Sequence, residues 1–307
     1  MSKHKKTVTI GIPAHNEAGN IARSIESILS QSEINFRIDK IIISCDGSTD
    51  NTAEIVREIA AKNKKVYLID DGQRLGQGRR LNQLLKLNTS DIFVTVDADT
   101  FIKDKKCFFY IAEAFNDKEI GLVGGGDTPL PGKTFAEKVA VSAINLWLYT
   151  RQNINNGDSV HNSHGCILAF NKQYAQTVEI PTDIIGNDEF LYFDAISKKF
   201  KFKFVPEAVV YYRAPTTFSD YFRQSSRFLN TQKLIENHFG AWVNTYYVVP
   251  LSNKVQGLIK GLLKDHVYFV MAIAAQIWIR IAKNMLHEDY TNGTWESIKS
   301  TKSQIKI

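Results

Sequence analysis

Short β-branched runs alternate with helix-like segments through the first third of the chain, and this alternation constrains the fold more than any other feature. The strand-like runs lie at residues 8–12, 41–43, 66–69 and 92–96. Between the first two, Ile21, Ile25 and Ile28 share one helical face. Strands and helices in alternation predict an α/β fold with a mostly parallel central sheet flanked by helices.

Polar residues follow three of these strand-like runs. Asn16 and Glu17 come after the first, Asp46 after the second, and Asp97 and Asp99 after the fourth. In open parallel sheets the ligand crevice lies outside the carboxyl ends of the strands. The sequence therefore predicts one binding site, at the edge of the sheet where these residues meet.

Asp97-Ala98-Asp99 is the strongest candidate for a metal site. Two carboxylates two residues apart can both reach one ion where the chain turns after a strand, and oxygen ligands suit Mg²⁺ or Mn²⁺. A solvated turn is the alternative interpretation of any isolated motif of this kind. Its position at a strand end, with Asp46 upstream, favours metal binding here.

Asp46 has two interpretations. Its carboxylate can accept hydrogen bonds from a nucleotide base or ribose, or it can cap the following turn. Arg74, Arg79 and Arg80 lie in or beside a glycine-rich stretch, residues 72–78. They could donate to phosphates, or they could simply start an exposed helix.

Two further pairs are weaker candidates. Asp188 and Glu189 are adjacent, and one of them could act as a general base toward an acceptor hydroxyl. Gln224 and Arg227 are three residues apart, hence on one face of a predicted helix. On spacing alone, both pairs could equally be exposed surface features.

The 307-residue chain carries a net charge of +6, which favours anionic partners such as nucleotide diphosphates or lipid phosphates. We find no aromatic–basic pattern of the kind that binds nucleic acid. Cys45, Cys107 and Cys166 have neither disulfide nor zinc spacing. With no signal peptide recognised, we expect a cytoplasmic protein with small buried thiols.

The sequence changes character after about residue 235. Residues 255–286 are rich in aliphatic and aromatic side chains, and the densest run, 267–279, is shorter than the about 20 residues that span a bilayer. Two interpretations stay open: a basic amphipathic helix at a membrane surface, or a helix packed on the catalytic domain. We predict a domain at 1–235 and a helical region at 236–307, peripheral at the inner face of the membrane under the first interpretation.

In order, these segments resemble the inverting family 2 glycosyltransferases of the GT-A fold. The resemblance rests on five segments: residues 10–17 (IGIPAHNE), 45–52 (CDGSTDNT), 97–99 (DAD), 186–191 (GNDEFL) and 224–228 (QSSRF). Three departures from the family pattern are Cys45 for Asp, Gln77 where a Lys is frequent, and Phe228 for Trp in QxxRW.

This resemblance implies a role for each matched residue. Asp188 would be the base, and Gln224 and Arg227 would line the acceptor or diphosphate site. Asp99, with Asp97, would bind the metal. The donor-binding residues would be Pro13, His15, Glu17, Asp46, Arg79, Asp97, Ala98 and Asp99.

The expected activity is metal-dependent transfer of a sugar from a nucleotide-sugar, with UDP the family's usual carrier, to a glycan or lipid-linked acceptor. Family members bearing QxxRW are often polysaccharide synthases or lipid glucosyltransferases of the cell envelope. We expect transfer of one or a few sugars rather than processive extrusion. The alternatives are a nucleotidyltransferase acting on sugar phosphates and an inactive homologue that binds glycans or membranes.

Overall fold

The computed structural model describes residues 5–227, 231–285 and 299–302. The strands are β1 (Lys6–Ala14), β2 (Phe36–Cys45), β3 (Val66–Asp70), β4 (Ile92–Val96), β5 (Thr100–Ile102), β6 (Ile120–Pro129), β7 (Ile167–Asn171) and β8 (Lys201–Tyr212). The α-helices are α1 (Ile21–Leu29), α2 (Thr52–Lys62), α3 (Gln77–Lys86), α4 (Cys107–Ala114), α5 (Phe135–Arg151), α6 (Lys172–Ala175), α7 (Asn187–Ser197), α8 (Phe218–Arg227), α9 (Thr231–Phe239), α10 (Leu251–Lys264) and α11 (His266–Met285). Short 3₁₀ helices are η1 (Ile154–Gly157), η2 (Val160–Asn162), η4 (Ala241–Tyr247) and η5 (Lys299–Thr301).

One sheet organises these elements, in the order β3-β2-β1-β4-β7-β6-β8-β5. β1 runs parallel to both β2 and β4, and β2 runs parallel to β3. β7 is antiparallel to β4 and to β6, whereas β6 and β8 are parallel. The α/β prediction is confirmed, and the four strands that the strand–helix alternation identified, β1 to β4, form one continuous parallel part of the sheet.

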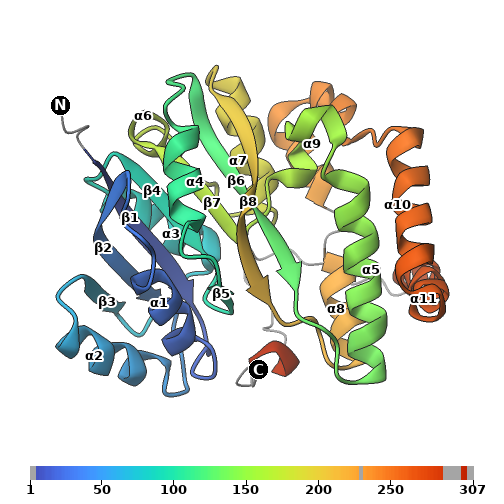
Figure 1. The fold of residues 1–307 in the computed structure, drawn as a ribbon, viewed down its shortest axis with the longest axis horizontal. Helices are drawn as coiled ribbons and strands as arrows, with labels where there is room; N and C mark the ends of the chain where they lie inside the picture. The colour runs from blue at the N-terminus through green and yellow to red at the C-terminus, as the bar shows by residue number, and fades with distance from the viewer. Residues whose placement is uncertain (1–4, 228–230, 286–298, 303–307) are drawn as a thin grey trace.

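Helices cover both faces of the sheet (Figure 1). Val8, Ile10 and Ile12 of β1 point to a core shared with α1, α2 and α4. On the opposite face, residues of α3, α6 and α7 pack in a second core with Phe93 and Phe170. The three cysteines are buried thiols without disulfides, as expected from the sequence.

Gly124, Gly125 and Gly126 in β6 explain an irregular part of the sheet. A Cβ on these glycines would lie 2.5, 2.6 and 2.8 Å from the backbone oxygens of Asn162, Ala208 and Pro206, respectively. The pairing of β6 with β8 shifts register between Gly125 and Gly126. Glycine therefore lets β8 and η2 approach the strand closely, which larger residues would prevent.

The C-terminal helices α10 and α11 lie beside α5 (Figure 1). Ala272 and Ile279 of α11 pack against Val139 and Ala140 of α5 in a third core. The boundary predicted at residue 235 falls inside α9. Within the helices that the structure describes, none is long and apolar enough to cross a membrane.

Candidate active site

The polar clusters that follow β1, β2 and β4 meet at one edge of the sheet, because these parallel strands are adjacent and in register. Ala14 at the end of β1 pairs with Cys45 at the end of β2. The next residue, Asp46, donates its backbone N–H to the carbonyl oxygen of Ala14 at 2.8 Å. The predicted meeting of these clusters is thus present.

The turn after β1 is held by side chains of residues 48–52. Asn16 adopts a left-handed conformation with φ of 53°, and its Oδ1 accepts from the Thr49 amide at 2.7 Å. The amide of Glu17 donates to Oγ1 of Thr52 at 2.7 Å. Asp50 accepts from the amide of Ala18 at 3.1 Å. The two sequence segments are therefore one structural unit, and it orients Glu17 toward the site.

Asp46 is buried and satisfied by its own neighbours. Its Oδ1 accepts from the amide of Leu75 at 2.6 Å and from Nε of Arg80 at 3.1 Å. Its Oδ2 accepts from Arg74 at 2.9 Å, and the amide of Gly76 lies 3.1 Å from both oxygens. The Asp46 carboxylate thus anchors the glycine-rich loop, whereas the capping interpretation expected contacts with the turn at residues 47–49. Its predicted nucleotide contact stays a prediction.

The three arginines of that region have different environments. Arg80 is fully buried, and it pairs with Asp46 and with Asp71 at 2.6 Å. Arg74 also pairs with Asp46, whereas Arg79 is exposed on α3. Arg80 is thus the arginine whose guanidinium is buried against the loop. The donor contact predicted for Arg79 stays a prediction.

The loop after β4 presents Asp97 and Asp99. The hydroxyl of Thr100 donates to the carbonyl oxygen of Asp97 at 2.8 Å, which closes the turn. Ala98 is buried in the core between the two acids. Gln77, at the start of α3, donates from Nε2 to Oδ1 of Asp97 at 3.1 Å. The residue that departs from the family pattern therefore contacts the first acid of the motif.

Negative charge accumulates at this point. Burial and the charges of Asp99, Asp188 and Glu17 raise the pKa of the Asp97 carboxyl well above its ordinary value. Burial and the charge of Asp99 raise the pKa of Glu17 to about 7. Several carboxylates that repel one another in a desolvated pocket favour a bound cation.

Asp188, in the first turn of α7, belongs to the same cluster of carboxylates. Its Oδ2 accepts from the amide of Gly165 at 3.2 Å. A Cβ built on Gly165 would lie 3.9 Å from an oxygen of Asp188 and 3.9 Å from an oxygen of Asp97. Gly165 therefore sits between the two carboxylates, and any side chain there would enter the space that they share.

The structure separates the roles of Asp188 and Glu189. Glu189 accepts a 2.5 Å hydrogen bond from the hydroxyl of Tyr247, and burial raises its pKa to about 8. Asp188 is half-buried beside Gly165. Of the two adjacent acids, Asp188 is the one that lies beside Gly165 and Asp97, and its role as base stays a prediction.

The acids of this pocket match the chemistry of a divalent metal bound with a diphosphate. Asp97 and Asp99 would supply hard oxygen ligands, and Mg²⁺ or Mn²⁺ commonly completes its shell with water and substrate phosphates. Among the residues that the structure describes, no group of three or more His, Cys, Asp or Glu side chains forms a metal cage. A metal site with two protein carboxylates, completed by substrate oxygens, is consistent with the pair Asp97 and Asp99 and with the lack of a larger group of ligands among the described residues.

The remaining predicted residues are less tightly defined. Pro13 lies in β1 beside Ser44, and Nδ1 of His15 is 2.8 Å from the carbonyl oxygen of Asp46. Gln224 is half-buried on α8. Arg227 ends that helix, but its side chain lies outside the described residues. The acceptor or diphosphate roles of Gln224 and Arg227 stay predictions.

Sequence reasoning missed Gly165 and Lys302. Gly165 lies two residues before β7, and a glycine between a strand and a polar loop is a usable indication of close approach. Lys302 bonds to Glu17 across almost the whole length of the chain. No local sequence pattern could have indicated that contact.

Comparison with known proteins agrees with this geometry. The sequence model of glycosyl transferase family 2 matches residues 9–178, more than half of the chain. Poly-beta-1,6-N-acetyl-D-glucosamine synthase of Staphylococcus aureus (strain MSSA476) is 25% identical over 223 residues, which are 72% of this chain and 53% of that protein. The Staphylococcus epidermidis synthase is 24% identical, over 74% of this chain and 55% of its own length. The chain thus spans about half the length of these curated relatives.

Solved structures show the same fold at low sequence identity. A mannosyltransferase from Pyrobaculum calidifontis, in complex with GDP-Man and Mn²⁺, is 18% identical with a TM-score of 0.58, covering 93% of this chain and 77% of that one. Glucosyl-3-phosphoglycerate synthase from Mycobacterium tuberculosis, in complex with Mn²⁺, UDP and phosphoglyceric acid, is 18% identical with a TM-score of 0.51, covering 76% and 79%.

Proposed function

Since this chain belongs to glycosyl transferase family 2, we propose that it moves a sugar from a nucleotide-sugar to a hydroxyl of a glycan or lipid-linked acceptor. The observation that carries the proposal is the position of Gly165 between the carboxylates of Asp97 and Asp188. A donor-side acid and a candidate base thereby share one pocket. Direct displacement needs both groups near the reacting atoms.

Asp99 and Asp97 are the residues that would hold Mg²⁺ or Mn²⁺. When bound, such an ion supplies positive charge that stabilises the diphosphate as a leaving group. The neighbours crystallised with Mn²⁺ and a nucleotide support this assignment of the cofactor class. The excess negative charge around Asp97 supports it independently.

Asp188 is the proposed general base. Its carboxylate takes the proton of the acceptor hydroxyl while the hydroxyl oxygen bonds to the anomeric carbon. The bond from that carbon to the diphosphate oxygen breaks, and the nucleoside diphosphate leaves with the electron pair. Because the attack comes from the face opposite the leaving group, the anomeric configuration inverts.

UDP-N-acetylglucosamine is the first donor to test. The S. aureus and S. epidermidis relatives are named for a polymer of N-acetyl-D-glucosamine. One structural neighbour holds UDP and another holds GDP-Man, so GDP-mannose is the second donor. We also propose that the transferred sugar becomes part of a cell-envelope glycan.

The deciding experiment is a product assay with these donors, Mn²⁺ and short glycan or lipid-phosphate acceptors. We expect the nucleoside diphosphate to be released together with an inverted glycoside, and EDTA to abolish both. Pyrophosphate release from a nucleoside triphosphate and a sugar phosphate would instead identify a nucleotidyltransferase. Folded protein that releases neither product under any of these conditions would contradict an enzymatic role.

We also propose that α10 and α11 rest on an anionic membrane surface. Their inner side packs on α5, so the packed-helix interpretation holds for that side. Their outer side exposes large apolar residues: Leu251, Val255, Leu258, Ile259, Leu262, Leu263, Val267, Val270, Met271, Ile277, Trp278 and Ile281. Apolar exposure on this scale is typical of an interaction surface.

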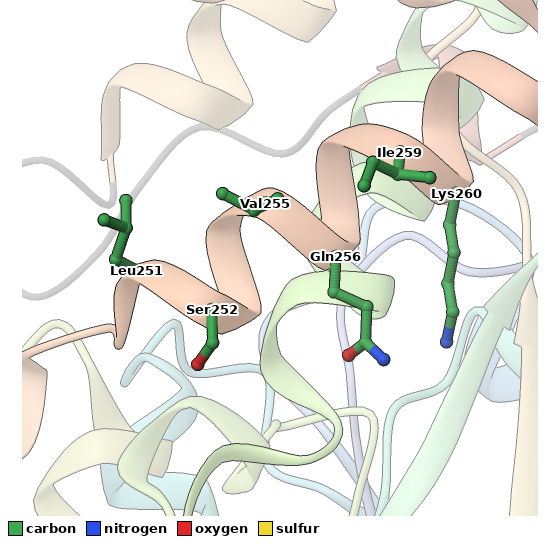
Figure 2. Close-up of a pocket in the computed structure, with 6 residues that line it drawn as sticks. All are labelled: Leu251, Ser252, Val255, Gln256, Ile259 and Lys260. Carbon is green, nitrogen blue, oxygen red and sulfur yellow. The ribbon is translucent and has the colours of Figure 1, made fainter.

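Charge favours lipid as the occupant of that surface. Lys254, Lys260, Lys264 and Arg280 are exposed on the same two helices, while the side chain of Lys283 lies outside the described residues. Figure 2 shows Leu251, Val255 and Ile259 along one side of α10, with Ser252, Gln256 and Lys260 along another. An apolar stripe beside basic residues matches a helix that lies in the headgroup region of anionic lipids.

Vesicle flotation tests the membrane proposal. We expect the protein to float with vesicles containing phosphatidylglycerol, and much less with pure phosphatidylcholine. Leu263→Glu, at a position that is 81% exposed, should abolish flotation without unfolding the protein. Equal binding by Leu263→Glu and wild type would contradict the assignment, and self-association without vesicle binding would assign the surface to a second copy of the chain.

A further inference from the structure

The C-terminal segment 299–302 lies against the candidate donor site, although the donor-binding residues predicted from the sequence all lie between Pro13 and Asp99. The carbonyl oxygen of Thr301 accepts from Nδ2 of Asn20 at 3.0 Å, and Thr301 is buried. The same Asn20 amide group lies 2.9 Å from Oε2 of Glu17. The segment is therefore joined to the turn that follows β1.

Contacts with the other half of the molecule fix the segment from its far side. The amide of Ser300 donates to Oδ2 of Asp220 at 3.1 Å, and the hydroxyl of Ser300 accepts from the amide of Thr216 at 3.2 Å. Figure 1 shows this segment between the α1 side of the sheet and α8. These three hydrogen bonds, from two sides, define a docked position.

That position places the ammonium group of Lys302 on the acids of the site. Nζ of Lys302 forms an ion pair with Oε1 of Glu17 and donates to the carbonyl oxygen of His15 at 3.1 Å. The Glu17 side chain is 5% exposed, so this pair is largely removed from solvent.

Two arginines of the glycine-rich loop and α3 form ion pairs with other acids. Arg74 and Arg80 form ion pairs with Asp46, and Arg80 also pairs with Asp71. Lys302, in contrast, pairs with Glu17 in the cluster that contains the proposed metal ligands. A positive charge in that place affects both ligands of a metal-dependent donor site. It repels the divalent cation and attracts the diphosphate.

We propose that Lys302 is a donor-site residue whose ammonium group competes with the divalent cation for the acidic cluster and attracts the diphosphate of the donor. This inference rests on the proposed function, and it adds to it a residue supplied by the C-terminal segment. In the donor-free protein Lys302 balances part of the charge of Glu17 and its neighbours. With metal bound, it becomes a positive charge beside the leaving diphosphate.

The test measures Mn²⁺ binding by the electron paramagnetic resonance of free Mn²⁺, without nucleotide and with saturating UDP, and UDP binding in EDTA by calorimetry. Lys302→Gln is compared with Lys302→Arg, which keeps the charge. Lys62→Gln, an exposed lysine at the end of α2 and far from this edge of the sheet, is the control for net charge.

Opposite changes in the two affinities are expected. Lys302→Gln should bind Mn²⁺ alone roughly threefold to tenfold more tightly and UDP in EDTA more weakly by a similar factor, as loss of one partly screened charge predicts. Saturating UDP should shrink the difference in Mn²⁺ affinity. Lys302→Arg and Lys62→Gln should behave like wild type.

Two other results have distinct meanings. If wild type binds Mn²⁺ with UDP, but Lys302→Gln leaves the affinity for Mn²⁺ alone unchanged or weakens it, Lys302 only supports the turn and the inference is overturned. If folded wild-type protein binds neither Mn²⁺ nor UDP, the proposed function itself fails and the inference falls with it.

Discussion

Two regions of the molecule differ in which side chains they bury. The sheet edge with Glu17, Asp46, Asp97 and Asp99, the acid edge, buries charged groups, whereas the outer side of α10 and α11 exposes apolar ones. At the sheet edge, even a charged group such as Arg80 is fully buried and bonded to neighbouring acids. On the outer helices, Leu263 and Trp278 are 81% and 64% exposed. The first arrangement suits the proposed binding of small charged ligands, and the second suits the proposed membrane contact.

This contrast indicates that the two regions are maintained by different forces. Hydrogen bonds and ion pairs in a low-dielectric pocket give the acid edge its fixed geometry. The hydrophobic effect holds α10 and α11 through their inner sides alone, because their outer sides gain nothing from folding. Substitutions in the two regions should therefore affect different properties of the protein, and by different amounts.

The largest expected effect is on catalysis at the acid edge. Asp188→Asn should lower the transfer rate by roughly 10²- to 10⁴-fold, because the amide cannot take the acceptor proton. Binding of the nucleoside diphosphate should stay within about twofold of wild type. The neighbouring exposed Asp183→Asn is the control, and it should keep full activity. Retained turnover in Asp188→Asn would remove Asp188 from its proposed role.

The next effect concerns stability at the same edge. Arg80→Met removes a buried guanidinium and leaves Asp46 without one of its two cationic partners, which should cost about 3–5 kcal/mol in the free energy of unfolding. Arg79→Met, on the exposed neighbour, should change it by less than about 0.5 kcal/mol. Urea titration of both variants checks this, and equal losses would contradict the distinction between the two arginines.

A smaller effect depends on pH. The pKa of Glu189 is about 8 in the folded protein, above its ordinary value of 4.5, because burial disfavours the charged form. Between these values the folded state holds the proton that the unfolded state has lost, so this group lowers stability as pH rises, by at most about 1.4 kcal/mol per pH unit. Glu189→Gln should flatten that decline in denaturant titrations from pH 5 to 9. An unchanged slope would mean that Glu189 is charged in the folded protein.

The smallest effect is expected on the outer helices. Leu263→Ala should change the free energy of unfolding by less than about 0.5 kcal/mol, because Leu263 is 81% exposed. Ile279→Ala, in the same helix pair but 3% exposed, should cost about 2–5 kcal/mol. Similar losses in the free energy of unfolding for the two variants would contradict this prediction. They would mean that the outer side of α10 and α11 is buried in solution.

The parallel half of the fold could be predicted from the sequence because its pattern is local. Each strand is an apolar run, each helix has its own periodicity, and parallel pairing then brings Asp46, Asp97 and the turn at Glu17 to one edge. The second half could not be predicted in the same way. β6 contains three consecutive glycines whose purpose is visible only once Pro206 and Ala208 approach them.

The site shows the same limit. Asp97 and Asp188 could be identified from short motifs, and the structure places both beside Gly165. The partners of Asp46 and the contact of Lys302 with Glu17 depend on long-range packing. Such contacts form only when the whole chain is folded, so no spacing of residues along the sequence reports them.

The central claim is that the acid edge binds a nucleoside diphosphate through a divalent cation held by Asp99 and Asp97. Isothermal titration calorimetry with UDP, GDP and dTDP, each with Mn²⁺ and with EDTA, tests it most directly in wild type and in Asp99→Ala. The account predicts that one nucleotide binds wild type, with a loss of more than about tenfold in EDTA and in Asp99→Ala. Nucleotide binding that is equally tight with Mn²⁺, with EDTA and in Asp99→Ala would contradict it.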